Sequence, residues 1–428
     1  MICFWGHGAG GILEKFIING GNKLYGEINV QGAKNAVLPL LSAAILTEET
    51  VSLKNVPDLT DVRNMVAILE SLGAQATFKD HTLTIDSSNA TKYSIKNSLA
   101  KELRSSVFLL GAILSRTRRA IVAYPGGCDI GLRPIDIHIK ALKDFGANIE
   151  EKSGYVYCDG ENISASEIYL DYPSVGATEN AMLLASNLKG RSIINNAARE
   201  PEIVELQNFI NKMGGKITGA GTSRICVEGV ENLRGTEYTV MPDRIVTGTY
   251  ALAVLACGGE VSIKGALSTD INSLLVKLSK SSCNIDINNG IIYINSYGRL
   301  KSVNNISTQP YPGFPTDLQA PFMTLETISS GTCVLTENIF ENRFKHIQEL
   351  RKMGADIIIN DRTAVIKGVK ELYGAEINAS DLRGGAALVL AGLAAKGITV
   401  VNGIHHIDRG YERIEKVFTD LGADIIRV

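Results

Sequence analysis

An internal repeat runs through the whole chain and limits the possible folds more than any other feature. Six segments share one pattern, an amphipathic helix that ends in a hydrophobic residue followed by Gly and a small residue. The marker positions recur every 68 to 73 residues, and the fourth copy has Cys in place of Gly; they are 73, 146, 214, 283, 354 and 422. Self-similarity at a fixed spacing indicates an architecture of repeated units.

Each marker helix has the same surroundings. Two strand-like segments joined by a short turn follow it, as in residues 75–86 and 284–295. An earlier helix rich in Ala and Leu precedes it, then a strand such as residues 50–56 or 397–403. Gly just past a helix end supplies a left-handed C-cap, and Asn-Gly supplies a hairpin turn. The predicted unit is therefore strand, helix, strand, helix, strand, strand.

The two chain ends complement each other. The last copy stops at residues 423–428, one strand short, whereas residues 14–20 form a strand with no unit of its own. We expect this strand to complete the sixth unit, which argues against an open array of units. Two domains of three units follow, comprising residues 34–241 and residues 14–33 plus 242–428. Residues 1–13 are expected to form a flexible N-terminal extension, and a ligand cleft is expected where the chain crosses between the domains.

Composition excludes several classes of protein. The 428 residues carry a net charge of −2, from 43 Lys and Arg against 45 Asp and Glu, so no general basic field for nucleic acid is present. The longest apolar run, Ala386–Ala395, is about half the ~20 residues of a membrane span. The sequence has no basic segment followed by an apolar stretch, so we expect no signal peptide. We therefore expect a cytoplasmic protein that neither binds nucleic acid nor inserts into membranes.

Cofactor and metal signatures are weak. The seven cysteines are odd in number, widely spaced and without a CxxC motif, which favours a reduced protein without a structural zinc site. His405–His406 has no nearby Cys partner. Gly6, Gly8 and Gly11 have GxGxxG spacing, but no strand of a strand–helix–strand unit precedes them. No metal and no organic cofactor are expected.

An irregular segment at 124–138 contains a cysteine in an unusual setting. Cys128 lies among glycines in a polar loop, and Arg133 follows five residues later. Glycines let a loop move and let its backbone approach a ligand. The cysteine could act as a thiolate favoured by nearby cations, or as a proton donor if it stays protonated. Ordinary burial, the usual fate of a free cysteine, is the alternative.

Polar clusters meet the starts of the six Ala-rich helices. Asp and Ser are favoured helix caps, which accounts for Ser174, Asp317 and Asp381. Capping does not account for cations at these starts, because they oppose the helix dipole; a bound phosphate is the simplest explanation. Asp317 could instead act as a base beside a cationic cleft. The cations at the helix starts are Lys34, Arg104, Arg244 and Arg383, and the cations before marker helices, which could also form salt bridges, are Arg343 and Arg409.

Taken together, these motifs resemble the UDP-N-acetylglucosamine enolpyruvyl transferases (1-carboxyvinyltransferases) of the EPSP synthase-like superfamily. The similarity covers residues ~15–428. Eight motifs carry it in family order: GAKNA (32–36), PGGCDIGLRPIDIH (125–138), SVGATEN (174–180), NAAREPEIV (196–204), FPTDLQAP (314–321), FENRF (340–344), SDLR (380–383) and HIDRGYERIE (406–415). The resemblance implies an α/β fold, a two-domain inside-out barrel of six βαβαββ repeats, three in each domain, with helices inside and sheets outside.

The resemblance also implies roles for individual residues. Cys128 would be the loop acid and the site of a covalent phosphoenolpyruvate adduct, and fosfomycin an inhibitor. Tyr172 departs from members that carry Lys at this position, so an ion pair with the nucleotide is in doubt there. The phosphoenolpyruvate side would consist of Lys34, Asn35, Arg343, Asp381, Arg383 and Arg409. The sugar-nucleotide contacts would be Arg104, Arg133, Pro134, Ile135, Asp136, Ile137, Tyr172, Pro173, Ser174, Val175, Asp317 and Ile339.

The implied reaction joins the sugar 3-hydroxyl to C2 of phosphoenolpyruvate and then expels phosphate, the first committed step of peptidoglycan precursor synthesis. Asp317 is the candidate base and Cys128 the candidate acid, while Lys34 and Arg409 complete the catalytic set. The expected partners are phosphoenolpyruvate and UDP-N-acetylglucosamine alone, bound to a monomer that closes around them. The alternatives are 5-enolpyruvylshikimate 3-phosphate synthase, an RNA-end-processing cyclase and a non-catalytic sugar-nucleotide sensor.

Overall fold

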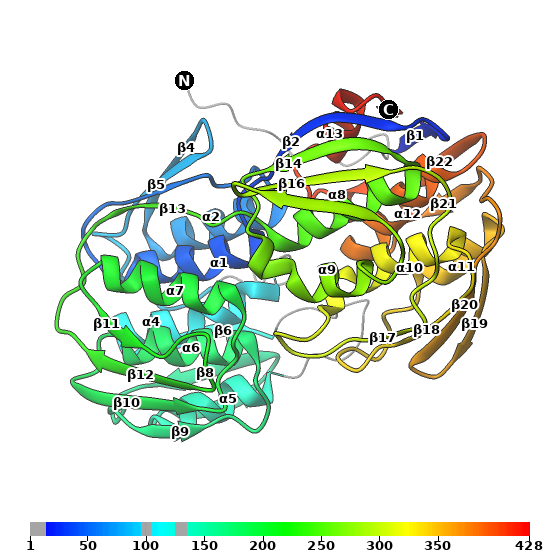
Figure 1. The fold of residues 1–428 in the computed structure, drawn as a ribbon. Helices are drawn as coiled ribbons and strands as arrows, with labels where there is room; N and C mark the ends of the chain where they lie inside the picture. The colour runs from blue at the N-terminus through cyan, green and yellow to red at the C-terminus, as the bar shows by residue number, and fades with distance from the viewer. Residues whose placement is uncertain (1–13, 96–98, 100–103, 125–134) are drawn as a thin grey trace.

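The structure, a computed structural model, describes residues 14–95, 99, 104–124 and 135–428 (Figure 1). Three predicted site residues, Cys128, Arg133 and Pro134, and the predicted extension 1–13 lie outside these residues. The backbone of Arg104 begins the short helix η2 (Arg104–Phe108), and the structure does not describe its side chain.

Three units build the first of two lobes. Each unit has an inner helix, a strand, an outer helix and a β-hairpin. The elements are α1 (Lys34–Ala43), β3 (Val51–Lys54), α2 (Thr60–Leu72), β4 (Gln75–Lys79) and β5 (Thr82–Asp86); α4 (Leu109–Thr117), β6 (Arg119–Ala123), α5 (Asp136–Asp144), β7 (Asn148–Lys152) and β8 (Tyr155–Asp159); and β9 (Glu167–Tyr169), α6 (Val175–Ala185), β10 (Gly190–Asn195), α7 (Pro201–Lys212), β11 (Lys216–Thr218) and β12 (Arg224–Gly229).

Three further units build the second lobe in the same order. Their elements are β2 (Leu24–Asn29), α8 (Arg244–Cys257), β14 (Gly259–Lys264), α9 (Asn272–Leu278), β15 (Asn284–Asn288) and β16 (Ile291–Ser296); β17 (Asn305–Ser307), α10 (Gln319–Ile328), β18 (Thr332–Thr336), α11 (His346–Lys352), β19 (Asp356–Asn360) and β20 (Thr363–Lys367); and β21 (Glu376–Asn378), α12 (Leu382–Ala394), β22 (Ile398–Asn402), α13 (Ile414–Asp420), β23 (Asp424–Arg427) and β1 (Phe16–Asn19).

Each unit contributes one small sheet to the outside of its lobe. Five of the six sheets have four strands within the described residues, for example β17-β18-β20-β19, in which β17 is parallel to β18 and the other pairs are antiparallel. The sheet β6-β8-β7 has three named strands, and a parallel bridge joins Ser94 to Ile121 at its edge. Burial alternates along strands such as β5 and β20, so one face meets the helices and the other faces outward.

The inner helices are buried on all sides. In α6 every residue from Gly176 to Ala185 is buried, and in α12 every residue from Arg383 to Leu393. These helices are rich in Ala, Gly and Leu and lack a continuous polar face, which is typical of a helix at the centre of a core. No helix among the described residues has both the length and the apolar character needed to cross a bilayer.

The marker glycines take the left-handed conformation that the repeat predicts. Their φ angles lie between 93° and 113° in five copies, at Gly73, Gly146, Gly214, Gly354 and Gly422. The prediction that Cys283 replaces Gly in the fourth copy is wrong by one residue, because Ser282 has the positive φ of 64°. The strand of each copy begins two residues after the left-handed position, at Gln75 after Gly73 and at Asn284 after Ser282.

The two chain ends lie together in one sheet. Strand β1 pairs antiparallel with both β22 and β23, and it supplies the strand that the sixth unit otherwise lacks. Lys15 and Val428 exchange two backbone hydrogen bonds, of 2.8 and 3.0 Å. Figure 1 shows the blue N-terminal strand beside the red C-terminal segment. Phe16 and Ile18 of this strand point into the second lobe and are fully buried.

Two crossings of the chain join the lobes. Strand β2 pairs with β14 in the second lobe but leads into α1 of the first, whereas β13 (Glu237–Thr239) pairs with β3 in the first lobe but leads into α8 of the second. The crossing segments run antiparallel, with hydrogen bonds from Ala33 N to Met241 O (2.8 Å) and from Asp243 N to Gln31 O (2.9 Å). The starts of α1 and α8 are therefore neighbours.

The hydrophobic core divides into two clusters near these crossings. One cluster spans residues 33–241, and the other combines residues 16–30 with residues 245–425. The domain limits that the sequence analysis gives, 34–241 and 14–33 plus 242–428, stay predictions.

We expect the N-terminal strand to be part of the second lobe's stability. Phe16→Ala removes a fully buried ring and should lower the free energy of unfolding by about 3–5 kcal/mol. Ile17→Ala, on the outward face of the same strand, is the matched control and should cost less than half as much. Urea unfolding of both variants measures this, and equal effects would contradict the role assigned to β1.

Candidate active site

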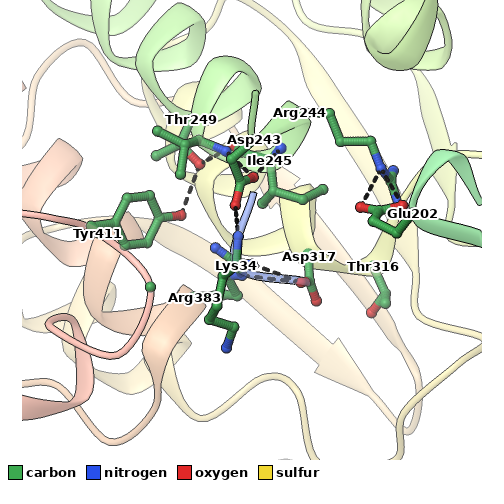
Figure 2. Close-up of polar contacts among 12 residues, drawn as sticks. Lys34, Glu202, Asp243, Arg244, Ile245, Thr249, Thr316, Asp317, Arg383 and Tyr411 are labelled. Carbon is green, nitrogen blue, oxygen red and sulfur yellow. Dashed lines mark hydrogen bonds and ion pairs between the residues drawn. The ribbon is translucent and has the colours of Figure 1, made fainter. Parts of the chain in front are cut away.

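The site begins where α1 and α8 start side by side. Asp243 caps α8, accepting hydrogen bonds from Ile245 N (2.8 Å) and Val246 N (3.0 Å). Its other oxygen accepts from the backbone N of Lys34 (3.1 Å), which begins α1 (Figure 2). Burial raises the pKa of Asp243. One carboxylate therefore fixes both helix starts at the crossing.

A buried carboxylate holds two cations from different lobes. The Nζ of Lys34 lies 3.1 Å from Oδ2 of Asp61, and the Nε of Arg409 lies 2.9 Å from Oδ1. The side chains of Lys34 and Asp61 are 11% and 2% exposed, and that of Arg409 is 37% exposed. Burial, together with the charges of Arg383 and Arg409, lowers the pKa of Lys34, and Asp61 opposes this. Burial also disfavours ionised Asp61, but Lys34 and Arg409 outweigh it and lower its pKa.

A second carboxylate, Asp317, lies between two buried arginines. Arg343 Nη2 donates to Oδ1 (2.7 Å), and Arg383 donates to Oδ2 through Nη2 (2.9 Å) and Nε (3.1 Å). Figure 2 shows the Arg383 guanidinium extended toward Asp317, beside Lys34. Asp317 lies in η4 (Thr316–Leu318), where no side chain caps the turn. The capping explanation for Asp317 is therefore wrong, because its oxygens accept from arginines instead.

Arg343 and Arg383 each keep a buried donor with no hydrogen-bond partner among the described residues, the Nε of Arg343 and the Nη1 of Arg383. Both side chains are at most 4% exposed. Leaving a buried N–H unmatched is costly, so such donors indicate a place for an anion. The two arginines supply N–H groups beyond those that Asp317 accepts.

The ring of Tyr411 packs against the guanidinium of Arg383. Its hydroxyl is 2.9 Å from Oγ1 of Thr249, and the Arg383 guanidinium carbon lies 5.5 Å from the ring centroid. Burial raises the pKa of Tyr411. Burial by itself would lower the pKa of Arg383, but the neighbouring Asp317 and Tyr411 have the larger effect, so the pKa of Arg383 is raised. Arg383 is therefore held as a cation.

The predicted sugar-nucleotide residues lie near a separate contact between the lobes. Ser174 caps α6 by accepting from Ala177 N (3.4 Å). Tyr172 is 42% exposed, and burial together with the charges of Glu200 and Glu337 raises its pKa. Glu337 also accepts from the backbone N of Ile339 (2.9 Å). Glu337 of the second lobe, which binds the backbone of Ile339, is therefore near enough to Tyr172 of the first lobe for its charge to act on the phenol.

Other predicted residues take places consistent with packing or capping. Asp381 caps α12 by accepting from Arg383 N (3.0 Å) and Gly384 N (2.9 Å). Asn35 lies partly buried in the first turn of α1, and Asp136 begins α5. The structure places the remaining described positions at the starts of α5 and α6; they are Ile135, Ile137, Pro173 and Val175.

Arg244, another cation at a helix start, pairs with a carboxylate of the other lobe. Its Nε donates to both oxygens of Glu202 (3.0 and 3.3 Å), and its guanidinium lies over the ring of Tyr311. The ion pair joins the lobes, because Arg244 begins α8 of the second lobe and Glu202 belongs to α7 of the first, whereas Tyr311 lies in the same lobe as Arg244. Arg244 therefore contributes a buried ion pair to the contact between the lobes.

The structure brings together Lys34, Asp317, Arg343, Arg383 and Arg409, which the sequence analysis names, and adds residues that it misses. Asp61 is one, because an Asp in the first turn of a helix looks like an ordinary response to the helix dipole. Asp243 and Tyr411 are the others. No cluster of three or more His, Cys, Asp or Glu side chains within the described part of the chain is arranged to hold a metal ion.

Comparisons with known proteins give consistent matches. A family model described as EPSP synthase (3-phosphoshikimate 1-carboxyvinyltransferase) matches residues 18–418. A relative from Caldanaerobacter subterraneus, named UDP-N-acetylglucosamine 1-carboxyvinyltransferase 2, is 50% identical, covering 97% of this chain and 100% of its own. A UDP-N-acetylglucosamine 1-carboxyvinyltransferase from Halothermothrix orenii is 46% identical with the same coverage.

Two solved structures share the architecture. The enolpyruvyl transferase NikO from Streptomyces tendae superposes with a TM-score of 0.88 at 22% identity, covering 97% of this chain and 99% of that one. EPSP synthase from Acinetobacter baumannii superposes with a TM-score of 0.73 at 18% identity, covering 97% and 100%. The predicted fold class is confirmed.

We expect His346 to stay uncharged across the neutral range. It is buried beside Arg343, and burial lowers its pKa to about 4, although Asp381 opposes the shift. A histidine with a lowered pKa costs stability as the pH falls from about 6.5 toward 4, by up to about 3 kcal/mol, because the unfolded chain takes up the proton first. A pH titration by NMR of histidine-labelled protein, assigned with His346→Gln, checks this. A midpoint above pH 6 would contradict it.

Proposed function

Because this chain belongs to the EPSP synthase family and matches the UDP-N-acetylglucosamine 1-carboxyvinyltransferases over nearly its whole length, we propose that it transfers the enolpyruvyl group of phosphoenolpyruvate to UDP-N-acetylglucosamine. The acceptor is the 3-hydroxyl, and phosphate is released. Membership of the family confirms the resemblance that the sequence motifs carry and the assignment to an enzyme class. The reaction is the first committed step of peptidoglycan precursor synthesis, and we place it in the cytoplasm, in a monomer.

The observation that supports this proposal most strongly is the excess of positive charge at the crossing. Lys34, Arg343, Arg383 and Arg409 outnumber the carboxylates around them. Asp61 and Asp317 are ion-paired with these cations, and Asp243 caps α8 beside them. Phosphoenolpyruvate carries a phosphate and a carboxylate close together, and both are good partners for guanidinium and ammonium groups. We assign these four cations to the phosphoenolpyruvate side, with Asn35 and Asp381 at the adjoining helix starts.

The proposed chemistry is an addition followed by an elimination. The sugar oxygen bonds to C2 of phosphoenolpyruvate as the double-bond electrons take a proton at C3, and a base accepts the hydroxyl proton. The C2–O bond to phosphate then breaks, the proton at C3 leaves, and the double bond re-forms. Fixed cations contribute most if they bind more strongly as charge develops on the departing phosphate. No step in this sequence calls for a metal or an organic cofactor.

Asp317 is our candidate base. Each carboxylate oxygen has two lone pairs. Oδ2 accepts two hydrogen bonds from Arg383, whereas Oδ1 accepts one from Arg343, so we assign Oδ1 to the substrate hydroxyl. The side chain is 24% exposed, in contrast to its nearly enclosed arginine partners, so it can meet substrate. Cys128 is our candidate acid at C3 and adduct site, on the resemblance alone, since it lies outside the described residues.

For the sugar nucleotide we propose the positions that frame the second contact between the lobes. Tyr172, Pro173, Ser174 and Val175 lead into α6, and Ile339 follows Glu337 across the boundary. Tyr172 would offer a ring and a hydroxyl where other members offer an ammonium group. The remaining proposed contacts are Arg104, Arg133, Pro134, Ile135, Asp136, Ile137 and Asp317.

The first test is phosphate release from phosphoenolpyruvate with either of two acceptors. We expect release with UDP-N-acetylglucosamine and none with shikimate 3-phosphate. Release only with shikimate 3-phosphate would assign the chain to the activity that the family model's description names. Binding of UDP-N-acetylglucosamine without release from either mixture would favour a non-catalytic sensor.

Replacing Asp317 tests the base directly. Asp317→Asn should lower kcat by about 10²–10⁴-fold, the usual contribution of general acid–base catalysis, while UDP-N-acetylglucosamine still binds. Asp356→Asn, at an exposed position that begins β19, is the matched control and should leave kcat unchanged. Steady-state phosphate release and calorimetric binding measure these values. A kcat for Asp317→Asn within threefold of the parent would exclude it as the base.

A further inference from the structure

Asp61 is an unusual buried carboxylate that no sequence motif singles out. Its side chain is 2% exposed, in the first turn of α2, and both carboxylate oxygens accept hydrogen bonds. Oδ1 accepts from Arg409 Nε at 2.9 Å and Oδ2 from Lys34 Nζ at 3.1 Å. Lys34 and Asp61 belong to the first lobe, whereas Arg409 comes from the second, 348 residues further along the chain than Asp61.

The segment around Asp61 meets the segment around Arg409 along several contacts. Thr60 N donates to Asp408 O (3.3 Å), and Asp58 N donates to Oε2 of Glu412 (3.1 Å). Asp61 and Arg409 form the charged contact within this junction. The position of Arg409 relative to Lys34 therefore depends on one carboxylate and on the lobes being together.

Gln31, on the crossing itself, ties the same junction from the other side. Its Nε2 donates to Gly410 O (3.3 Å), and its Oε1 accepts from Glu412 N (2.9 Å). These bonds hold the backbone on either side of Arg409. Asp61 then fixes the direction of the guanidinium.

The charge of Lys34 also depends on this carboxylate. The charged groups near Lys34 are Asp61 from α2, Asp243 at the start of α8, Arg383 from α12, and Arg409. Asp243 receives the backbone N–H of Lys34, whereas the Nζ of Lys34 donates to Asp61. Burial and the two arginines favour the uncharged amine, and Asp61 favours the ammonium form.

We propose that Asp61 is a positioning residue for the reaction, which holds the Lys34 ammonium and the Arg409 guanidinium on one side of a shared anion and couples them across the two lobes. The proposal rests on the proposed function, in which these two cations bind phosphoenolpyruvate. Asp61 itself does not touch substrate. With its two oxygens directed at the cations, Asp61 fixes where the Lys34 and Arg409 head groups lie relative to the shared anion.

The test compares Asp61→Asn with Asp58→Asn over pH 5.5–9. Asp58 lies three residues before Asp61, ahead of α2, and its side chain pairs with the exposed Arg63, so it is the matched control. For Asp61→Asn we expect KM for phosphoenolpyruvate to rise about 10- to 100-fold at pH 8 and to recover partly toward pH 6, because Lys34 loses the group that favours its charge. We expect kcat to change less than KM. A KM and pH profile equal to those of Asp58→Asn would overturn the proposal.

A second readout does not depend on turnover. Lysines methylated with ¹³C-formaldehyde are titrated by NMR, and the Lys34 signal is assigned with Lys34→Arg. Asp61→Asn should move the Lys34 midpoint down by at least about one pH unit, and Asp58→Asn should not move it. An unmoved midpoint would overturn the coupling. If the parent protein releases no phosphate, the proposed function fails while this titration still decides the coupling.

Asp61→Glu covers the case in which the Asn variant does not fold. It keeps the charge but lengthens the side chain by one methylene. We expect a Lys34 midpoint near that of the parent together with a KM for phosphoenolpyruvate that is still raised severalfold. A KM equal to that of the parent would show that the position of the carboxylate is irrelevant and would contradict the proposal.

Discussion

Burying several cations together is the constraint on which the rest of the site depends. Lys34, Arg343, Arg383 and Arg409 gather where the chain crosses between the lobes, and unpaired buried charges would be very costly. Asp61 and Asp317 each pair with two of them, which makes the cluster tolerable but leaves donors on Arg343 and Arg383 without partners among the described residues. These unmatched donors support the proposal that an anion completes the cluster. The two carboxylates set where the cations point.

The fold supplies this arrangement through its repeats. Each unit contributes one buried helix, and the two antiparallel crossings bring the starts of α1 and α8 together. Asp243 joins the two starts by capping one and accepting the first N–H of the other. Strand β1 completes the sheet of the sixth unit by pairing with β22 on one side and with β23 on the other. Backbone hydrogen bonds at the crossing therefore help to position the cation cluster, whose members come from residues 34 to 409 of the sequence.

Much of this was accessible from the sequence, because local rules produce it. The marker glycines, the hairpins and the succession of helices and strands in each unit follow from turn chemistry and periodicity. The cations at helix starts stand out because they oppose the dipole. The misses come from contacts between distant segments. Asp61 meets Arg409 across 348 residues, and Arg244 finds Glu202, so no local pattern reports either pair. The left-handed position of the fourth copy is Ser282 and not Cys283, because a serine, unlike a glycine, does not mark a left-handed position in the sequence.

The measurement that tests the central claim most directly is a crystal structure of the protein with UDP-N-acetylglucosamine and inorganic phosphate. The account predicts a phosphate at the lobe boundary, within hydrogen-bond distance, about 2.7–3.2 Å, of Lys34 Nζ and at least one guanidinium among Arg343, Arg383 and Arg409. It also predicts that Asp61 still contacts Lys34 and Arg409 in that state. A phosphate bound elsewhere, with the four cations contacting only carboxylates, would contradict it.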